Sequence, residues 1–142
     1  MNIKGLSNHI HFQKIFELNK NEDGSYNWIK IAQTPNLPLT FIDKYFFQIN
    51  KYKIEKYQTL SPYIIKKYGN YLNWNILLYS HNIPENLIEQ FLNRINWHIL
   101  IKTQKLSLNF LKKYKDKISI NDLSKNFEIN DEIKQEFISS LE

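Results

Sequence analysis

Cysteine is absent from this chain, which excludes disulfide bonds and thiolate metal sites. The glycines, Gly5, Gly24 and Gly69, are isolated, so the sequence has no glycine-rich loop that could cradle phosphate groups. No uninterrupted apolar run approaches the length that spans a bilayer, and residues 1–7 lack the apolar stretch of a signal peptide. From these absences we expect a cytoplasmic protein without membrane contact.

Metal-binding and catalytic patterns are also scarce. His9 and His11 stand two residues apart, a spacing that could chelate a metal only in a strand, and no third ligand is evident nearby. His81 and His98 have no Ser or Asp set against them at a spacing that recurs along the chain. The sequence therefore predicts no enzyme activity, no metal and no cofactor.

A period of 23 residues organises most of the chain, which has 142 residues and is 42% hydrophobic. The apolar columns that keep this period are Leu37, Leu60, Ile83, Leu106 and Ile129; Phe41, Ile64, Leu87, Phe110 and Ile133; Tyr45, Tyr68, Phe91, Tyr114 and Phe137; and Ile49, Leu72, Ile95, Ile118 and Leu141. So many matching columns do not arise by chance. We therefore expect a single domain over residues 1–142, with repeats at 37–59, 60–82, 83–105 and 106–128 and a half-repeat at 129–142 as the C-terminal cap.

Each repeat is expected to contain two short α-helices, here named helix A and helix B. Helix A carries the apolar columns at steps of four residues, which form one stripe of a helix. Helix B follows a polar column made of Asn27, Asn50, Asn73, Asn96 and Ser119, whose residue types are typical of helix N-caps. A functional asparagine ladder is the alternative interpretation, but capping explains both the position and the residue type.

Helices this short cannot bury their apolar stripes within one repeat, so neighbouring repeats must stack. The predicted fold is all-α, a right-handed α-solenoid of two-helix repeats. Trp28, Trp74 and Trp97 occupy core columns, which favours packing over the stacking of nucleic-acid bases. We expect Trp74 and Trp97 to be buried and stacked in adjacent repeats.

Residues 1–25 fit the period poorly and are expected to form an irregular N-terminal cap. Apolar residues between Leu6 and Leu18 favour a helix, followed by an insertion at residues 19–25. The Asp23-Gly24 pair could instead turn a β-hairpin between residues 11–18 and 26–31.

The outward side of helix B is the candidate partner-binding surface. The core takes the Trp and Leu columns of this helix, which leaves two outward columns four residues apart. These columns contain Tyr52 and Lys56, Asn75 and Tyr79, His98 and Lys102, and Asn121 and Lys125. Variable and partly aromatic side chains on a rigid frame are typical of a protein interface, and an ordinary solvated face is the alternative. Because the shorter helices of stacked pairs tend to lie inside the curve, we expect helix B on the concave face.

A strip of lysines on helix A is the second candidate surface. Lys44, Lys67 and Lys113 share one column, and Lys66 and Lys112 lie beside two of them. With a net charge of +5, such a strip could follow a nucleic-acid backbone. Solvated lysines of an outer face are the favoured explanation, because arginine, the residue preferred for phosphate and base recognition, occurs only once. A protein is therefore the expected partner and nucleic acid the alternative.

Some stretches carry a further pattern. Residues 37–45 read Leu-Pro-Leu-Thr-Phe-Ile-Asp-Lys-Tyr, residues 106–114 read Leu-Ser-Leu-Asn-Phe-Leu-Lys-Lys-Tyr, and residues 95–97 read Ile-Asn-Trp, with Gln104 following. They resemble a family of tandem helical repeats, common in giant DNA viruses and seen in some phages and AT-rich bacteria. Its units read Leu-Ser-x-x-Phe-Ile-x-Lys-Tyr and then Ile-Asn-Trp-x-x-Ile-x-x-Tyr-Gln. Lys51 and Ile120 depart from the Trp position of this pattern.

The resemblance covers residues 26–142 and implies a repeat without shared catalytic residues. By analogy with small viral and phage proteins, it also implies an inhibitor that covers a surface of a host defence complex, such as an RNA-guided nuclease, in the host cytoplasm.

Overall fold

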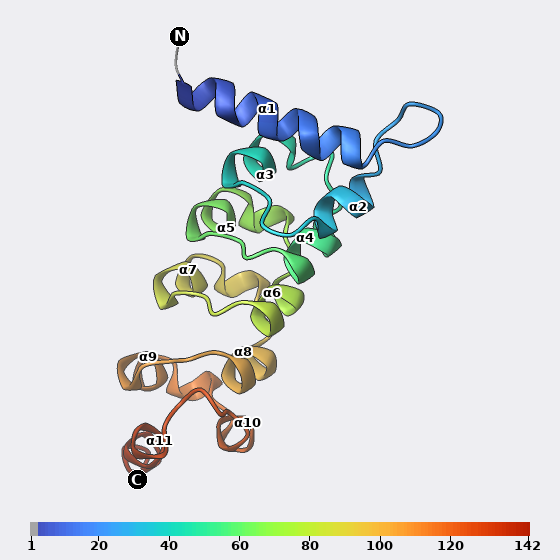
Figure 1. The fold of residues 1–142 in the computed structure, drawn as a ribbon. Helices are drawn as coiled ribbons and strands as arrows, with labels where there is room; N and C mark the ends of the chain where they lie inside the picture. Colours follow the sequence, from blue (N-terminus) through green and yellow to red (C-terminus); the bar gives the residue numbers. More distant parts are fainter. Residues whose placement is uncertain (1–2) are drawn as a thin grey trace. The chain divides into compact units, whose positions relative to one another are not determined.

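A computed structural model describes residues 3–142, without the side chains of Ile3, Lys4 and Leu6. Within these residues the protein is all-α, as predicted, with eleven α-helices, three short 3-10 helices and no β-strand (Figure 1). The α-helices are α1 (Ile3–Leu18), α2 (Trp28–Gln33), α3 (Leu39–Tyr45), α4 (Lys51–Tyr57), α5 (Pro62–Tyr68), α6 (Trp74–Ser80), α7 (Glu85–Gln90), α8 (Trp97–Thr103), α9 (Leu108–Lys113), α10 (Ile120–Ser124) and α11 (Asp131–Ser139). The 3-10 helices are η1 (Gly69–Tyr71), η2 (Leu92–Arg94) and η3 (Lys115–Lys117). None of the helices described is long and apolar enough to cross a membrane.

The helices begin at regular intervals. The starts of α2, α4, α6, α8 and α10 are residues 28, 51, 74, 97 and 120, and those of α3, α5, α7, α9 and α11 are residues 39, 62, 85, 108 and 131. Within each set, every start lies 23 residues after the one before it. The first set occupies the positions of predicted helix B and the second those of predicted helix A.

Helix A is shorter than the sequence predicts. The last apolar column lies beyond its end, and Leu72, Ile95 and Ile118 take extended backbone. The cause is the cap that follows, because an N-cap residue is itself non-helical and the chain must turn before it. Asn73 shows this directly, since its side chain accepts the backbone N–H groups of Asn75 and Ile76 at 3.1 and 3.4 Å.

All members of the polar column act as the predicted caps. The side chains of Asn27, Asn50, Asn73, Asn96 and Ser119 each accept at least one backbone N–H at the start of the helix that follows. An accepted N–H at this position stabilises a helix by about 1 kcal/mol, which matters for helices of only two turns.

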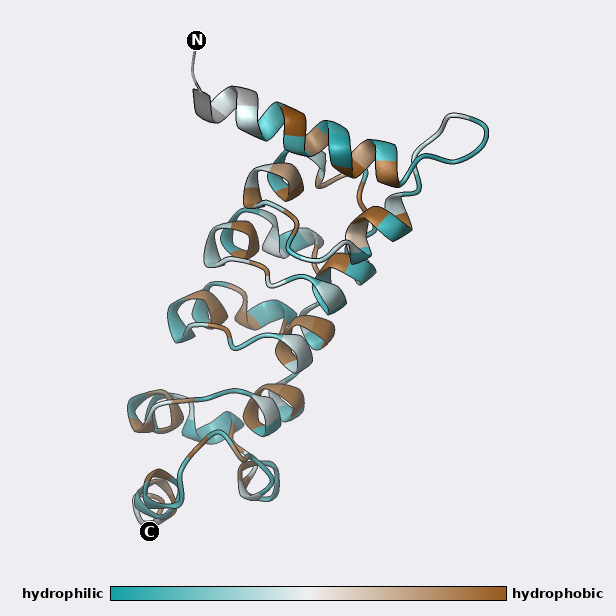
Figure 2. Ribbon diagram, in the orientation of Figure 1, coloured by the Kyte–Doolittle hydropathy of each residue, from teal (hydrophilic) through white to brown (hydrophobic). Residues whose placement is uncertain are grey.

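The chain divides into two compact units, Met1–Ile64 and Ile65–Glu142. The division falls inside α5, within a predicted repeat, and the single domain over residues 1–142 stays a prediction. Figure 2 shows hydrophobic residues on one side of the short helices and hydrophilic residues on the other.

In the first unit, the N-terminal segment is a helix rather than a strand of a hairpin. Helix α1 packs on α3 through Phe12 and Phe16, whose rings lie 5.0 and 5.5 Å from that of Phe41. The Asp23-Gly24 turn does form, with φ of +86° at Gly24, but it supports only an isolated bridge between Lys20 and Tyr26. Helix α2 packs against α4.

In the second unit, helices of the same set pack in succession. Helix α6 packs against α8, α8 against α10, and α9 against α11. Leu77 of α6, Leu100 of α8 and Leu123 of α10 are all buried. The apolar side of each short helix is therefore covered by its counterpart one repeat away.

Buried side-chain amides connect consecutive repeats through hydrogen bonds. Gln104 accepts the backbone N–H of Ile83 at 2.8 Å and donates to the carbonyls of Leu78 and His81 at 2.7 and 2.9 Å. Gln58 makes the same kind of bridge in the first unit, to the N–H of Leu37 and the carbonyls of Ala32 and Thr34. Asn126 donates to the carbonyls of Ile101 and Gln104 and accepts the N–H groups of Glu128 and Ile129.

The prediction of burial is right for Trp74 and wrong for Trp97, and the prediction that the two stack on each other is wrong. Trp74 is 2% exposed and donates from Nε1 to the Gly69 carbonyl at 2.9 Å, whereas Trp97 is only partly buried. Among the described residues the two indoles do not contact each other. Each packs instead on the aromatic residue that ends the next helix A, with ring centres 4.9 Å apart for Trp74 and Phe91 and 5.4 Å apart for Trp97 and Tyr114.

Candidate functional site

The outward positions of helix B are accessible in both units. In residues 65–142, Asn75, Tyr79, His98, Asn121 and Lys125 are exposed, and Lys102 is partly exposed. The Tyr79 side chain is among the most accessible aromatics, with 69% exposure. Because α6, α8 and α10 pack in succession, these side chains form one continuous row, here called the helix-B face. In the first unit, Tyr52 is 50% exposed and Lys56 is also exposed on α4.

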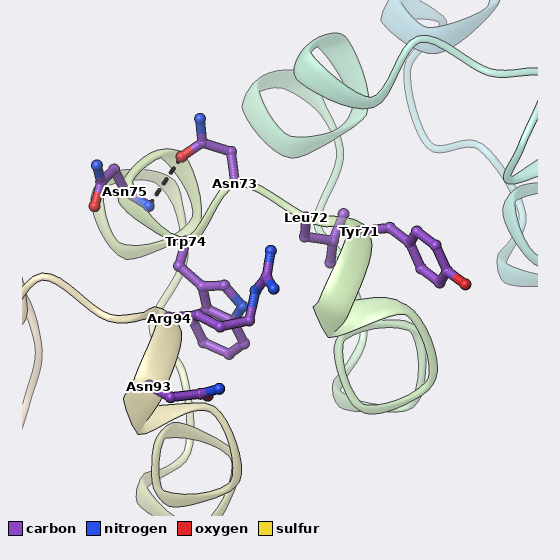
Figure 3. A pocket seen from close by; sticks show the side chains of 7 residues that line it. All are labelled: Tyr71, Leu72, Asn73, Trp74, Asn75, Asn93 and Arg94. Carbon is purple, nitrogen blue, oxygen red and sulfur yellow. Dashed lines mark hydrogen bonds between the residues drawn. The ribbon is translucent and has the colours of Figure 1, made fainter.

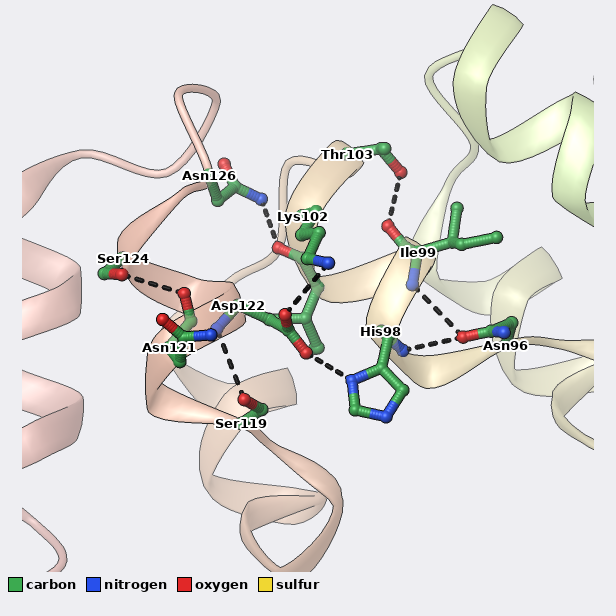
Figure 4. Close-up of polar contacts among 11 residues, drawn as sticks. Asn96, His98, Ile99, Lys102, Thr103, Ser119, Asn121, Asp122, Ser124 and Asn126 are labelled. Carbon is green, nitrogen blue, oxygen red and sulfur yellow. Dashed lines mark hydrogen bonds and ion pairs between the residues drawn. The ribbon is translucent and has the colours of Figure 1, made fainter.

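A buried carboxylate contacts two side chains of this face (Figure 4). Asp122 on α10 is only 4% exposed, and its Oδ2 lies 2.5 Å from Nδ1 of His98 on α8. Its Oδ1 lies 3.2 Å from Nζ of Lys102, one turn further along α8. Buried Asp122 thus joins α10 to two side chains of α8 that reach the surface.

The hydrogen bond to His98 is the main cause that lowers the pKa of Asp122, and Lys102 lowers it further, while burial acts in the opposite direction. Asp122 is therefore ionised at neutral pH. The His98 side chain remains 73% exposed, so Asp122 fixes one edge of the imidazole and leaves the rest facing solvent.

Sequence reasoning missed this contact because Asp122 does not belong to a recurring column. The available signal was the packing of equivalent helices: Asn121 is the counterpart of His98 one repeat later, and Asp122 is its neighbour. Comparing each histidine with the residues next to the equivalent position one repeat later therefore identifies the His98–Asp122 pair.

An aspartate that orients a histidine is also part of hydrolytic triads, which need a nucleophile on the other side of the ring. Among the described residues, the His98 ring makes no hydrogen bond to a hydroxyl group, and its side-chain partner is Asp122. The cluster thus orients a side chain and joins two helices, and it lacks the third member of a triad.

The described chain contains no group of three or more potential metal-ligating side chains. His9 and His11 both lie exposed on helix α1, where residues two apart point in different directions. The strand geometry that their spacing would need for chelation is therefore not present.

All five lysines of the predicted strip, Lys44, Lys66, Lys67, Lys112 and Lys113, are exposed. In the second unit, however, Lys113 lies 2.7 Å from Glu89 and Lys112 lies 3.5 Å from Glu136. The hydrogen bond from Lys113 is the main cause that lowers the pKa of Glu89. Paired lysines attract phosphate less strongly, which weakens the case for a nucleic-acid groove.

Comparison with protein-family models, with curated protein sequences and with solved structures found no match. The repeat family named from the sequence therefore stays an expectation, and function has to be inferred from the geometry of the chain itself.

Proposed function

We propose that the chain is a non-catalytic helical-repeat protein, an α-solenoid with a 23-residue unit, that binds another protein through the helix-B face. The regular helix starts support the repeat, because each set begins every 23 residues. The recurring amide bridges of Gln58 and Gln104 support it as well, because residues 46 positions apart hold equivalent loops.

The observation that carries the binding proposal is the exposure of Tyr79 on α6, which packs against the helix that bears the fixed His98, α8. Tyrosine supplies a large contact area with little conformational freedom to lose, and it is enriched among residues that dominate binding energy. The His98 imidazole on α8 is held by Asp122, so part of the surface is already ordered before a partner arrives.

Inhibition of a host defence complex is the specific role that the sequence resemblance implies. The helix-B face could carry out this role, because an inhibitor that covers a surface of its partner needs no catalytic group. Protein binding is favoured over nucleic-acid binding because two lysines of the helix A strip are paired with glutamates.

Affinity purification from the native host tests the proposal. We expect the wild-type chain to retain a partner protein and the variant Tyr79→Ala/His98→Ala to lose most of it, by about tenfold or more. The control is Tyr63→Ala on α5, since Tyr63 is also an exposed tyrosine, at 50%, but lies outside the helix-B face. Equal retention by the folded double variant would place the interface elsewhere.

A further inference from the structure

The only arginine of the chain lines a polar pocket in the second unit. This pocket has a volume of about 490 Å³ and opens between η1 and η2, at the start of α6. Its wall includes Asn73, Trp74, Asn75, Asn93 and Arg94, and none of the residues that line it is acidic (Figure 3).

The charge of Arg94 is not compensated. Its side chain is exposed and makes no ion pair or hydrogen bond with the described residues. A guanidinium group presents its N–H donors in a planar fork that matches a carboxylate with two parallel hydrogen bonds. The side-chain amides of Asn75 and Asn93 likewise have no partner in the described part of the chain.

The wall around Arg94 is rigid. Asn73 is fixed as the cap of α6, and the Trp74 indole is held by the Gly69 carbonyl. In Figure 3 the Arg94 side chain extends in front of Trp74, with Asn73 and Asn93 on either side of it. A ligand would therefore meet the unpaired side chains of Arg94, Asn75 and Asn93 beside a wall that is already ordered by Asn73 and Trp74, so binding does not have to order that wall.

We propose that this pocket binds the carboxylate of an acidic residue in a partner protein, with Arg94 holding the carboxylate and Asn75 and Asn93 holding the adjacent peptide bonds. A side-chain amide offers one donor and one acceptor group, which pairs with the C=O and N–H of a peptide. Asn75 lies one helical turn before Tyr79, so the pocket adjoins the helix-B face. The inference rests on the proposed function and names the chemistry of the partner.

A nucleic acid fits the pocket less well. Nucleic-acid binding draws its affinity from several phosphates neutralised together, whereas the pocket holds one cation. Base stacking also needs an exposed ring, but Trp74 is buried and Tyr71 points away from Arg94 in Figure 3.

Nuclear magnetic resonance tests the proposal, because a single arginine gives a single assignable Nε–Hε signal. The probes are an acetylated and amidated hexaglutamate peptide, the matching hexaglutamine peptide and single-stranded hexathymidylate. We expect hexaglutamate to shift the Arg94 signal, hexaglutamine to leave it unchanged, and hexathymidylate to bind more weakly than hexaglutamate.

The variant Arg94→Gln should weaken hexaglutamate binding about tenfold or more, as expected for the loss of charge-assisted hydrogen bonds. Lys117→Gln is the matched control, because Lys117 occupies the position equivalent to Arg94 one repeat later and is also exposed. It should change binding by less than about twofold. Arg94→Lys keeps the charge without the fork and should bind several-fold more weakly than wild type.

An unchanged Arg94 signal, an equal loss in Arg94→Gln and Lys117→Gln, or tighter binding of hexathymidylate would each overturn the proposal. If any of these occurs while the Tyr79→Ala/His98→Ala variant still loses its protein partner, the pocket proposal fails and the proposed function stands.

Discussion

At the scale of single residues, buried amides and one buried carboxylate make polar connections between repeats. Each glutamine bridge satisfies three backbone groups, one carbonyl in the last turn of a helix B and two groups in the loop that follows it. Removing such a side chain leaves these buried backbone groups without hydrogen-bond partners. The resulting loss of stability is larger than the net contribution of the same hydrogen bonds in the wild type.

We predict that Gln104→Ala lowers the free energy of unfolding by about 3 kcal/mol. Denaturant unfolding followed by circular dichroism measures this. Gln90→Ala, which removes an exposed glutamine at the end of α7, is the control and should change the value by less than about 0.5 kcal/mol. Similar losses in the two variants would show that the Gln104 bridge adds no stability.

Asp122 should make stability depend on pH. Because its pKa is lower in the folded chain than in the unfolded chain, its ionised form stabilises the fold above the usual aspartate pKa of about 3.9. This contribution is lost as the pH falls through the lower folded pKa.

The stability difference between wild type and Asp122→Asn should therefore be largest near neutral pH and shrink as the pH falls from about 5 to about 2. Denaturant midpoints along this range measure the difference, with Asp116→Asn, which removes an exposed carboxylate, as the control. A difference that stays constant over the range would contradict the role assigned to the His98 hydrogen bond.

At the scale of helices, aromatic pairs connect the starts of α2, α6 and α8 to the end of the next helix A. The Trp74–Phe91 pair has an additional requirement, because a Cβ atom at Gly69 would overlap the Phe91 ring. Gly69 follows α5 directly, so the absence of a side chain lets the next repeat approach closely.

We predict that Gly69→Ala destabilises the chain by about 1 to 3 kcal/mol through this overlap. Phe91→Leu should relieve part of the cost, so the double variant should lose less stability than the sum of the single changes. Asn70→Ala, an exposed change in the same 3-10 helix, is the control. If the stability losses of the two single variants simply add in the double variant, the strain does not come from the overlap between position 69 and the Phe91 ring.

The 23-residue columns were sufficient to predict where helices begin and which residues cap them, because caps and apolar stripes are local properties. They overestimated the length of helix A, since Ile95 and its equivalents keep an apolar column while leaving the helix. The Gln104 bridge could be suspected from the glutamine that ends the repeat motif, but its partners, Ile83 and Leu78, are set by packing between repeats.

At the scale of the whole molecule, the sequence predicted which helix-B residues face outward but not what lies between them. Tyr79, His98 and Lys125 are exposed as the helical period requires. The Asp122 contact and the Arg94 pocket depend on side chains from successive repeats, and neither Asp122 nor Arg94 belongs to a recurring column. Such features depend on tertiary packing, and a periodic pattern carries no information about them.

The buried and the exposed positions of the repeats are under different constraints. Buried columns must recur in every repeat to make a continuous core, whereas the exposed columns are free to differ. A protein that recognises one partner would use these differing positions, which is why the central claim of binding concerns the helix-B face rather than the lysine strip.

Site-specific photo-crosslinking in the native host tests that claim most directly. A photoreactive phenylalanine analogue is placed at position 79 or 98 on the helix-B face, or at exposed position 109 on α9 as the control. We predict that positions 79 and 98 crosslink to the same protein and that position 109 does not. Crosslinking only at position 109, or crosslinks to nucleic acid alone, would contradict the account.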